Sequence, residues 1–319
     1  MSFNIYTETR ENINFLILKN NKTSEYVEII PDLGGTVHKV CLDFGEGVKN
    51  ILFSDIDSEI TKYKLHKGRI LFPFNDLIPG GKYTFNNKEY QFDTSKRTDG
   101  NAKHGFIKFE KLKLINKEIN STNCSVKLCI NITNGQFQGY PFDIFFSINY
   151  ILYSNQLKLE FEIENKGKIT APIALGWHPY FTFDNSLINV FLKCNSKYYY
   201  EIDKNWLPIG KILECKNTQF DFSNGSKIKD IDIDNAFFVP DDGKVYLNRD
   251  NNSIEYYQDP KVFKFIQFFI PPDHNSIAIE PITAAANAFN KEELGLIKIN
   301  PGEIINTYAE VEVQCLDFS

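Results

Sequence analysis

The sequence predicts an all-β protein, a large antiparallel β-sandwich with at most short helices. Apolar and polar residues alternate over several long stretches, as they do in strands with one buried face and one solvated face. Phenylalanine and tyrosine, 28 and 16 of the 319 residues, favour pleated sheet surfaces. Residues 83–90 have the pattern of a hairpin, because Asn86 and Asn87 can adopt the positive φ of a tight turn.

Individual elements follow from the same alternation. We expect strands over residues 126–132, 157–164 and 305–313, each with apolar side chains at every second position. Only the segment Thr283–Leu294 has a helical pattern, and it is short. Neither a repeat nor a Gly/Pro/Ser-rich linker divides the chain, so we expect residues 1–319 to form a single domain.

Composition excludes several classes of protein. The net charge is −6 and no basic run is present, which argues against binding to nucleic acid or to an anionic membrane surface. The N-terminal residues lack the basic and apolar regions of a signal peptide, and no apolar stretch approaches 18 residues, so we expect a cytoplasmic protein. Six cysteines lie apart without CxxC pairs, as expected of reduced packing residues.

Three short motifs carry side chains suited to proton transfer. His104 follows the polar turn 98–101 and precedes Gly105, which would allow close backbone approach to a ligand. His178 lies within the aromatic segment 176–181, and Glu280 follows an apolar strand that we expect to stop at the next residue, a proline. Each residue alone has an ordinary structural explanation, as a loop histidine, a core histidine or an exposed strand end. Their conjunction in one chain points to general acid/base chemistry.

The motifs with their flanking residues resemble those of the aldose 1-epimerase family, and the resemblance covers most of the chain. The motif Gly176-Trp177-His178-Pro179-Tyr180-Phe181 is the most specific of the set. The matching segments, in chain order, are 71–75 with 81–85, 103–106, 176–181, 233–237, 267–269 and 279–283.

The resemblance implies a β-sandwich of the galactose mutarotase type that interconverts the α and β anomers of a free aldose without a cofactor or a metal. By the assignments of the family, Glu280 would be the general base, His178 the general acid and His104 a positioning group near the ring oxygen. Asp234 and Gln267 would hold sugar hydroxyl groups, and Asn75 belongs to the early sugar-site motif. Trp177 could stack on the sugar or could equally be part of the core.

One position departs from the family pattern. Asp76 stands where the family usually has an arginine after the motif asparagine, and a carboxylate cannot replace a guanidinium. Arg69 and Arg97 are near in sequence, and either could reach the site. The preferred sugar therefore stays open, as does the oligomeric state.

Three other functions compete with a mutarotase. A hexose 6-phosphate epimerase would need a cationic pocket for about two negative charges, and arginine is scarce near the motifs. A sugar-binding protein without turnover would gain little from an acid and a base at the anomeric carbon. A metal-dependent hydrolase using His104, His178 and Glu280 lacks the usual ligand spacings.

Overall fold

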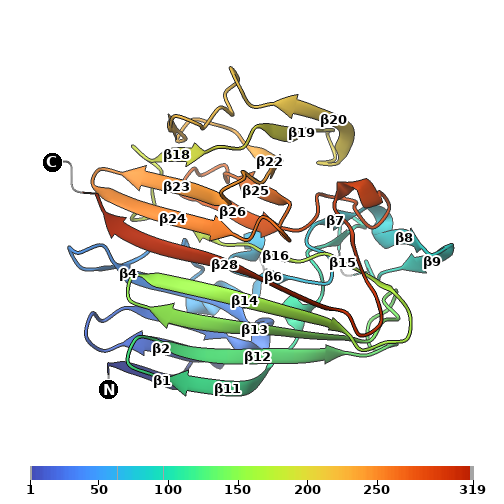
Figure 1. Cartoon of the computed structure of the whole chain (residues 1–319), viewed down its shortest axis with the longest axis horizontal. Coiled ribbons are helices and arrows are strands. Elements are labelled where there is room, and N and C mark those ends of the chain that lie inside the picture. Colours follow the sequence, from blue (N-terminus) through green and yellow to red (C-terminus); the bar gives the residue numbers. More distant parts are fainter. Residues whose placement is uncertain (1, 63, 96, 317–319) are drawn as a thin grey trace.

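The computed structural model describes residues 2–62, 64–95 and 97–316. In this part of the chain, two large sheets and a five-stranded sheet make up most of the molecule (Figure 1), and every strand pairing is antiparallel. The prediction of an all-β sandwich with short helices is confirmed. The helices described are single 3-10 segments: η1 (Pro31–Leu33), η2 (Asp57–Lys62), η3 (Lys64–His66), η4 (Pro79–Gly81), η5 (Ile107–Phe109) and η6 (Glu292–Leu294).

The nine-stranded sheet forms the front layer in Figure 1. Its strands, in spatial order, are β11 (Lys113–Ile119), β12 (Cys124–Ile132), β13 (Ile144–Tyr153), β14 (Gln156–Asn165), β28 (Ile304–Cys315), β24 (Asn252–Gln258), β23 (Lys244–Arg249), β18 (Phe191–Cys194) and β21 (Ser226–Lys227). Strands β12, β14 and β28 contain the three segments whose alternation predicted strands, so those predictions are confirmed.

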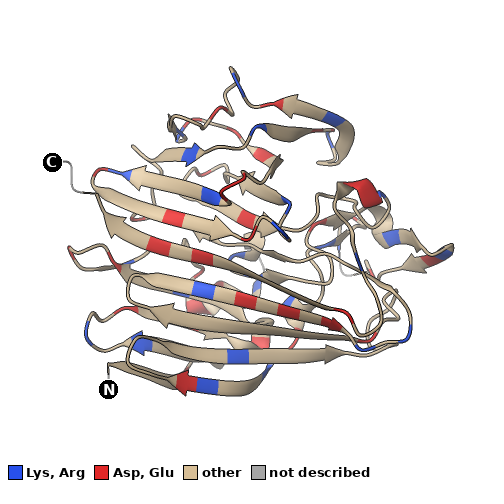
Figure 2. Ribbon diagram, viewed as in Figure 1, with Lys and Arg blue, Asp and Glu red and all other residues tan. Residues whose placement is uncertain are grey.

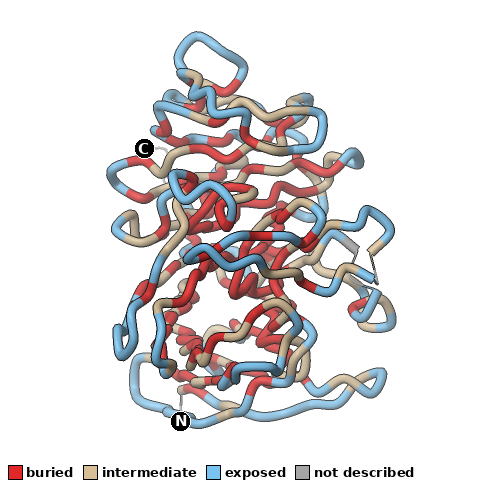
Figure 3. The backbone as a smooth tube through the Cα atoms, turned by 90° about the vertical axis from the view of Figure 1, so that its right-hand side faces the viewer, coloured by how far each residue is buried: buried red, intermediate tan, exposed pale blue. Residues whose placement is uncertain are grey.

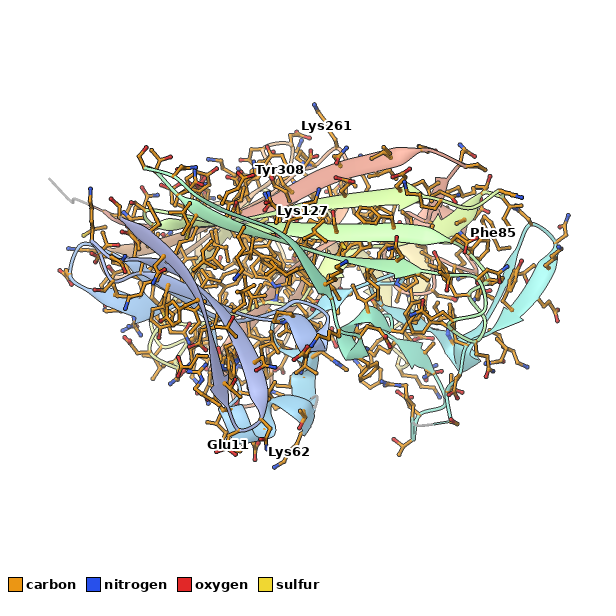
Figure 4. All side chains as sticks on the ribbon, turned by 90° about the horizontal axis from the view of Figure 1, so that it is seen from below. Glu11, Lys62, Phe85, Lys127, Lys261 and Tyr308 are labelled. Atoms are coloured by element: carbon orange, nitrogen blue, oxygen red, sulfur yellow. The ribbon has the colours of Figure 1, made fainter. Side chains whose placement is uncertain are left out.

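The outer face of this sheet carries its polar residues. Lys127 and Tyr308 lie on the outer side (Figure 4), and β14 carries charged residues of both signs whereas β28 carries only acidic ones (Figure 2). Lys127 binds Glu162 of β14, with 2.9 Å between Nζ and Oε2. The inner face packs into one continuous hydrophobic cluster, which reaches from Phe3 to Val313 and appears as the buried centre of the molecule in Figure 3.

The eight-stranded sheet lies behind the first, and its strands carry four of the eight predicted site residues, Trp177, Asp234, Gln267 and Glu280. Its spatial order is β20 (Pro208–Glu214), β19 (Tyr198–Ile202), β22 (Asp234–Phe238), β25 (Phe265–Phe269), β26 (Ile277–Ile282), β16 (Gly176–Trp177) and β6 (Ile70–Leu71), with β17 (Tyr180–Phe181) also paired to β26. Motifs that are far apart along the chain therefore become spatial neighbours through the order of the strands in this sheet.

Smaller sheets complete the fold. The five-stranded sheet contains β1 (Phe3–Arg10), β2 (Ile13–Asn20), β3 (Tyr26–Ile30), β4 (Thr36–Asp43) and β5 (Val48–Asn50). Three two-stranded sheets pair β7 (Leu77–Ile78) with β10 (Ala102–Lys103), β8 (Lys82–Phe85) with β9 (Lys88–Gln91), and β15 (Ala171–Ile173) with β27 (Ile297–Ile299). Asn86 and Asn87, at φ 50° and 59°, form the predicted hairpin turn between β8 and β9.

The predicted helix over Thr283–Leu294 is wrong, because it is replaced by turns and the short η6. Bonds within the segment form separate turns, and its backbone also bonds to other parts of the chain. The N–H of Thr283 donates to Leu175, and that of Asn287 donates to Leu77. Asn287 has φ 66°, which no α-helix allows. The alanines at 284–286 and 288, which look like a helical run, are buried.

Candidate active site

Three neighbouring strands, β22, β25 and β26, place three of the predicted site residues on one sheet face. Gln267 of β25 lies opposite Glu280 of β26, and Asp234 of β22 lies opposite Phe269, two residues further along β25. Since successive side chains of a strand point to opposite faces, these four side chains share one face. All of them line one cavity, and the structure therefore brings together Asp234, Gln267 and Glu280.

Glu280 faces a local interruption of the sheet. On one side β26 pairs with β25 throughout, but on the other it pairs first with β17 and then with β16. His178 and Pro179 separate these two short strands, and so the imidazole is delivered beside the carboxylate. His178 Nε2 lies 3.4 Å from Glu280 Oε1. Contrary to expectation, β26 does not stop at Pro281 but continues to Ile282. Pro281 has no N–H to donate, and none is needed there, because the sheet is interrupted between β17 and β16.

The His178 ring is held by two aromatic neighbours. It stacks on Tyr180, with ring centroids 5.0 Å apart and an interplanar angle of 11°, and it meets His104 edge to face at 5.2 Å. His178 is buried, and desolvation together with the charges of Lys103 and Lys108 lowers the pKa of its imidazole to about 3. At neutral pH the imidazole is therefore uncharged in this structure.

His104 is held by the backbone of the preceding motif. Its Nδ1 lies 2.9 Å from the carbonyl oxygen of Asn75, which can only accept, so Nδ1 carries the proton. His104 and Gly105 both have positive φ, at 62° and 63°. The glycine is required because a Cβ there would lie 2.1 Å from the carbonyl oxygen of Phe72. Close backbone approach at Gly105 thus serves contact with Phe72, whereas we expected it to serve a ligand.

A buried lysine lies beneath this loop. Lys108 Nζ donates to the carbonyl oxygens of Lys103, at 2.6 Å, and His104, at 3.1 Å. Its side chain is buried, and desolvation lowers its pKa well below the usual value. Lys108 thereby fixes the backbone on which His104 lies.

His66 is a cavity-lining histidine that the sequence did not single out. It lies on η3 with φ 53°, and its ring meets that of His104 edge to face at 4.8 Å. Burial and the nearby charge of Lys108 lower its pKa well below the usual value. His66, His104, His178 and Tyr180 therefore form a row of rings along one wall, and no motif spacing signals the first of them.

The charge of the cavity is dominated by carboxyl groups. Asp76, Asp234 and Glu280 line it together with Lys103, which pairs with Leu77 in the small β7–β10 sheet. Burial raises the pKa of Glu280 well above its usual value, the negative charges of Asp76 and Asp234 raise it further, and Lys103 lowers it. Asp76, the position that departs from the family pattern, is therefore inside the site. Lys103 supplies a positive charge to the same cavity.

Asp234 and Gln267 act as a pair. Gln267 Nε2 donates to Asp234 Oδ1 at 2.7 Å, which leaves the amide oxygen of Gln267 and the second carboxyl oxygen of Asp234 for other partners. Burial and the charge of Asp76 raise the pKa of Asp234 to about 6, against the lowering effects of Lys103 and of the bond from Gln267.

Three other predicted site residues have different surroundings. Asn75 lines the cavity, but its side-chain amide donates to the carbonyl oxygen of Ala284 at 2.6 Å. The guanidinium of Arg69 is buried outside the cavity lining, where it donates to Thr36 Oγ1 and to the carbonyl oxygen of Ile60. Trp177 is also outside the lining, fully buried against Phe181. Adjacency in sequence could not distinguish these orientations.

Arg97 does not line the cavity either, since it is paired with Asp99 at 2.7 Å.

Exposed apolar side chains also line the cavity, and no sequence pattern predicted them. Leu65 of η3 and Trp206 of the turn after β19 are exposed and form its rim, Ile202 of β19 is half-buried, and Pro208 of β20 lines the cavity but is buried. Polar groups capable of proton transfer lie at the floor, and aromatic and aliphatic surface lies at the entrance. Such a division is typical of small-molecule sites.

The side chains of the site are not arranged as metal ligands. Among the residues that the structure describes, no group of three or more His, Cys, Asp or Glu side chains could hold a metal ion. Within the same described residues, no helix is both long enough and apolar enough to cross a membrane.

Comparison with known proteins places the chain among sugar epimerase relatives. It is 22% identical to the uncharacterized protein YihR of Escherichia coli (strain K12) over 275 residues, covering 80% of this chain and 84% of that protein. A solved galactose mutarotase-like protein from Clostridium acetobutylicum superposes with a TM-score of 0.86 at 22% identity, covering 99% of each chain. For galactose 1-epimerase from Lactobacillus acidophilus NCFM the TM-score is 0.83 at 17% identity, again with 99% of each chain covered.

These solved structures share the fold. The family described as aldose 1-epimerase matches residues 16–311, nearly the whole chain, and the chain therefore belongs to the aldose 1-epimerase family.

Proposed function

We propose that the protein is a cofactor-independent mutarotase that interconverts the α and β anomers of a free, uncharged aldose. The observation that carries the proposal is the buried contact between His178 Nε2 and Glu280 Oε1, 3.4 Å apart at the floor of the cavity. A carboxyl group and an imidazole at this distance can act on the two neighbouring oxygens of an anomeric centre.

The reaction needs one proton acceptor and one proton donor. Glu280 takes the proton of the C1 hydroxyl, the C1 carbonyl forms, the bond between C1 and the ring oxygen breaks, and His178 protonates that oxygen. Rotation about C1–C2 and the reverse transfers close the other anomer. The proton count of the pair is unchanged over a cycle, so no external reagent is required. Each proton transfer contributes about 10²- to 10⁴-fold.

The pKa shifts favour a pair that shares one proton. Burial favours the uncharged forms of both groups, a neutral imidazole and a protonated carboxyl. The ionised arrangement, with the proton on the imidazole, has the same number of protons. A bound sugar whose hydroxyl groups donate to Glu280 stabilises that arrangement, and His178 then acts as the acid.

Positioning falls to the surrounding groups. The Asn75 bond leaves Nε2 of His104 as an acceptor, so His104 accepts a hydrogen bond from a hydroxyl group near the ring oxygen. Asp234 and Gln267 hold further hydroxyl groups through their remaining oxygens.

The charge of the cavity argues for an uncharged sugar over a hexose 6-phosphate. Three carboxyl groups, those of Asp76, Asp234 and Glu280, line the cavity. Lys103 is the one lysine or arginine among the described residues of the lining. A phosphate group near these carboxyl groups would meet like charge, and the pocket lacks the arginine cluster that binds phosphate well.

Exchange between anomers, followed by two-dimensional NMR with glucose, galactose, xylose and glucose 6-phosphate, tests the proposal. We expect acceleration with a free aldose that falls at least about 100-fold in Glu280→Gln, while Glu118→Gln on the exposed strand β11 retains wild-type rates. Sugar binding without acceleration would favour a non-catalytic sugar-binding protein.

A further inference from the structure

Trp206 is an exposed aromatic residue at the mouth of the cavity. It lines the cavity while 62% of its surface remains accessible to solvent. The mechanism above does not use it, because the polar groups for proton transfer lie at the floor. An exposed tryptophan beside a polar pocket presents a flat apolar face together with one hydrogen-bond donor, the combination that suits the apolar face of a sugar ring.

The turn that carries Trp206 is firmly built. Asp203 Oδ1 accepts from the N–H groups of Asn205, at 2.7 Å, and Leu207, at 3.1 Å, and the Asp203 N–H donates to the Leu207 carbonyl at 2.9 Å. The N–H of Trp206 donates to the carbonyl of Asp203 at 3.0 Å. Trp206 itself has φ 61°, a left-handed conformation that costs a bulky residue energy and persists where the surroundings enforce it.

The order of the strands places the turn of Trp206 at the end of a strand three positions away from that of Glu280. From β26, which carries Glu280, the sheet proceeds to β25 with Gln267, to β22 with Asp234, and then to β19, whose end leads into the Trp206 turn. Neighbouring strands lie about 4.8 Å apart, so β19 is about 14 Å from β26. A single pyranose ring with C1 at Glu280 reaches Asp234 and ends before this turn.

On this basis, and resting on the proposed mutarotase function, we propose that Trp206 forms a second sugar subsite. Its occupant is a second pyranose ring, joined to the anomerised sugar through a hydroxyl group other than the one at C1. The ring stacks on the indole, while Leu65 and Ile202 supply further apolar surface beside it. The preferred substrate is then a reducing disaccharide or the reducing end of a longer oligosaccharide.

The two tryptophans of the chain make the subsite directly measurable. Trp177 is fully buried, whereas Trp206 is exposed, so the solvent-sensitive part of the emission comes from Trp206. We expect cellobiose to shift the emission to shorter wavelengths and to reduce acrylamide quenching, and glucose to do neither. Trp206→Phe should abolish the response. Equal responses to the two sugars, or none to cellobiose, would overturn the subsite.

Kinetics give a second, independent measurement. Trp206→Ala should lower kcat/KM for cellobiose relative to that for glucose about five- to tenfold, mainly through KM, and Trp206→Tyr should restore most of it. Ile209→Ala is the matched control, because Ile209 is exposed on the same hairpin and does not line the cavity. An unchanged cellobiose to glucose ratio in Trp206→Ala would contradict the proposal.

The two proposals fail separately. If the wild type accelerated exchange for no sugar, the mutarotase function would be wrong, and the fluorescence measurement would still decide the subsite. If glucose exchange were fast and cellobiose neither bound nor reacted, the subsite alone would be wrong.

Discussion

The hydrogen bond from His104 Nδ1 to the carbonyl oxygen of Asn75, at 2.9 Å, determines which nitrogen of the imidazole faces the cavity. A carbonyl oxygen has no proton to give, so the neutral ring has its proton on Nδ1 and a lone pair on Nε2. His104 Nε2 is therefore an acceptor, and in the proposed function it accepts from a sugar hydroxyl group. It can receive a hydroxyl proton in a hydrogen bond, but in this tautomer it cannot donate to the ring oxygen.

The tautomer of His104 is the first prediction. Desolvation and the charges of Lys103 and Lys108 keep the pKa of His104 well below its usual value, so the ring should stay neutral from pH 5 to pH 8, across the range where an ordinary histidine titrates. Imidazole ¹⁵N NMR should show a protonated Nδ1 and a bare Nε2 throughout. His104→Gln identifies the resonance. Titration within this range, or protonation at Nε2, would contradict the assignment.

The second prediction concerns two charges with opposite effects on Asp234. Burial and the charge of Asp76 raise the pKa of Asp234, and the charge of Lys103 lowers it. Lys103→Met should therefore raise this pKa above about 6, and Asp76→Asn should reduce it. Carboxyl ¹³C NMR of the two variants measures both shifts without relying on activity.

Lys111→Met is the control for that experiment, since Lys111 is exposed and does not line the cavity. It should leave the Asp234 titration unchanged. Shifts of the same sign in Lys103→Met and Asp76→Asn would show that the variants act by rearranging the cavity and not through their charges.

The third prediction is a gain of stability from Asp234→Asn. A carboxyl with a native pKa of about 6, raised from 3.8, binds more protons in the folded than in the unfolded protein between these values. Stability contributed by the protonated group is therefore lost as pH rises from about 4 to about 6. At pH 7 the substitution should raise the free energy of unfolding by about 1–3 kcal/mol.

Urea unfolding at pH 7 and at pH 4 tests this effect. The gain should be present at pH 7 and nearly absent at pH 4, where Asp234 is protonated in the native state. An equal gain at both pH values would instead point to a packing effect of the substitution.

The fourth prediction concerns Asn75, which the family motif suggested as a sugar ligand. Its amide donates to the carbonyl of Ala284 at 2.6 Å and so ties the loop beneath the site to the first motif. Asn75→Ala leaves that buried carbonyl without this donor, and the free energy of unfolding should fall by about 1–3 kcal/mol. Chemical denaturation measures the loss.

Asn306→Ala, at an exposed position of β28, should cost much less and serves as the control. A stable Asn75→Ala protein with a raised KM would favour a direct role of the amide in sugar binding over the structural one.

Sequence periodicity predicted the strands well because one-sided burial imposes a period of two, as in β12, β14 and β28. It could not predict pairing. Asp234, Gln267 and Glu280 meet because β22, β25 and β26 are neighbours in the sheet, which depends on contacts far apart in the chain. The motifs that resemble the family supplied these residues, and the fold explains why they share one face.

The remaining differences come from side-chain direction. Arg69 and Trp177 lie next to site motifs in sequence yet point into other parts of the core, and a one-residue step along a strand is enough to reverse a side chain. His66 and Trp206 were missed because each belongs to a turn with positive φ. No local pattern encodes where such a turn lies relative to a distant sheet.

The interruption of the sheet beside Glu280 also bears on how the protein loses its site when heated. The amide of His178 donates to Arg69 at 2.9 Å, and that of Ile279 donates to Pro179 at 3.3 Å, so both sides of the gap are closed by main-chain bonds. These amides can exchange with deuterium only when the surrounding strands separate. We therefore expect His178 and Glu280 to part in the same cooperative event that melts the eight-stranded sheet, so that loss of the proposed activity on heating and unfolding share one midpoint.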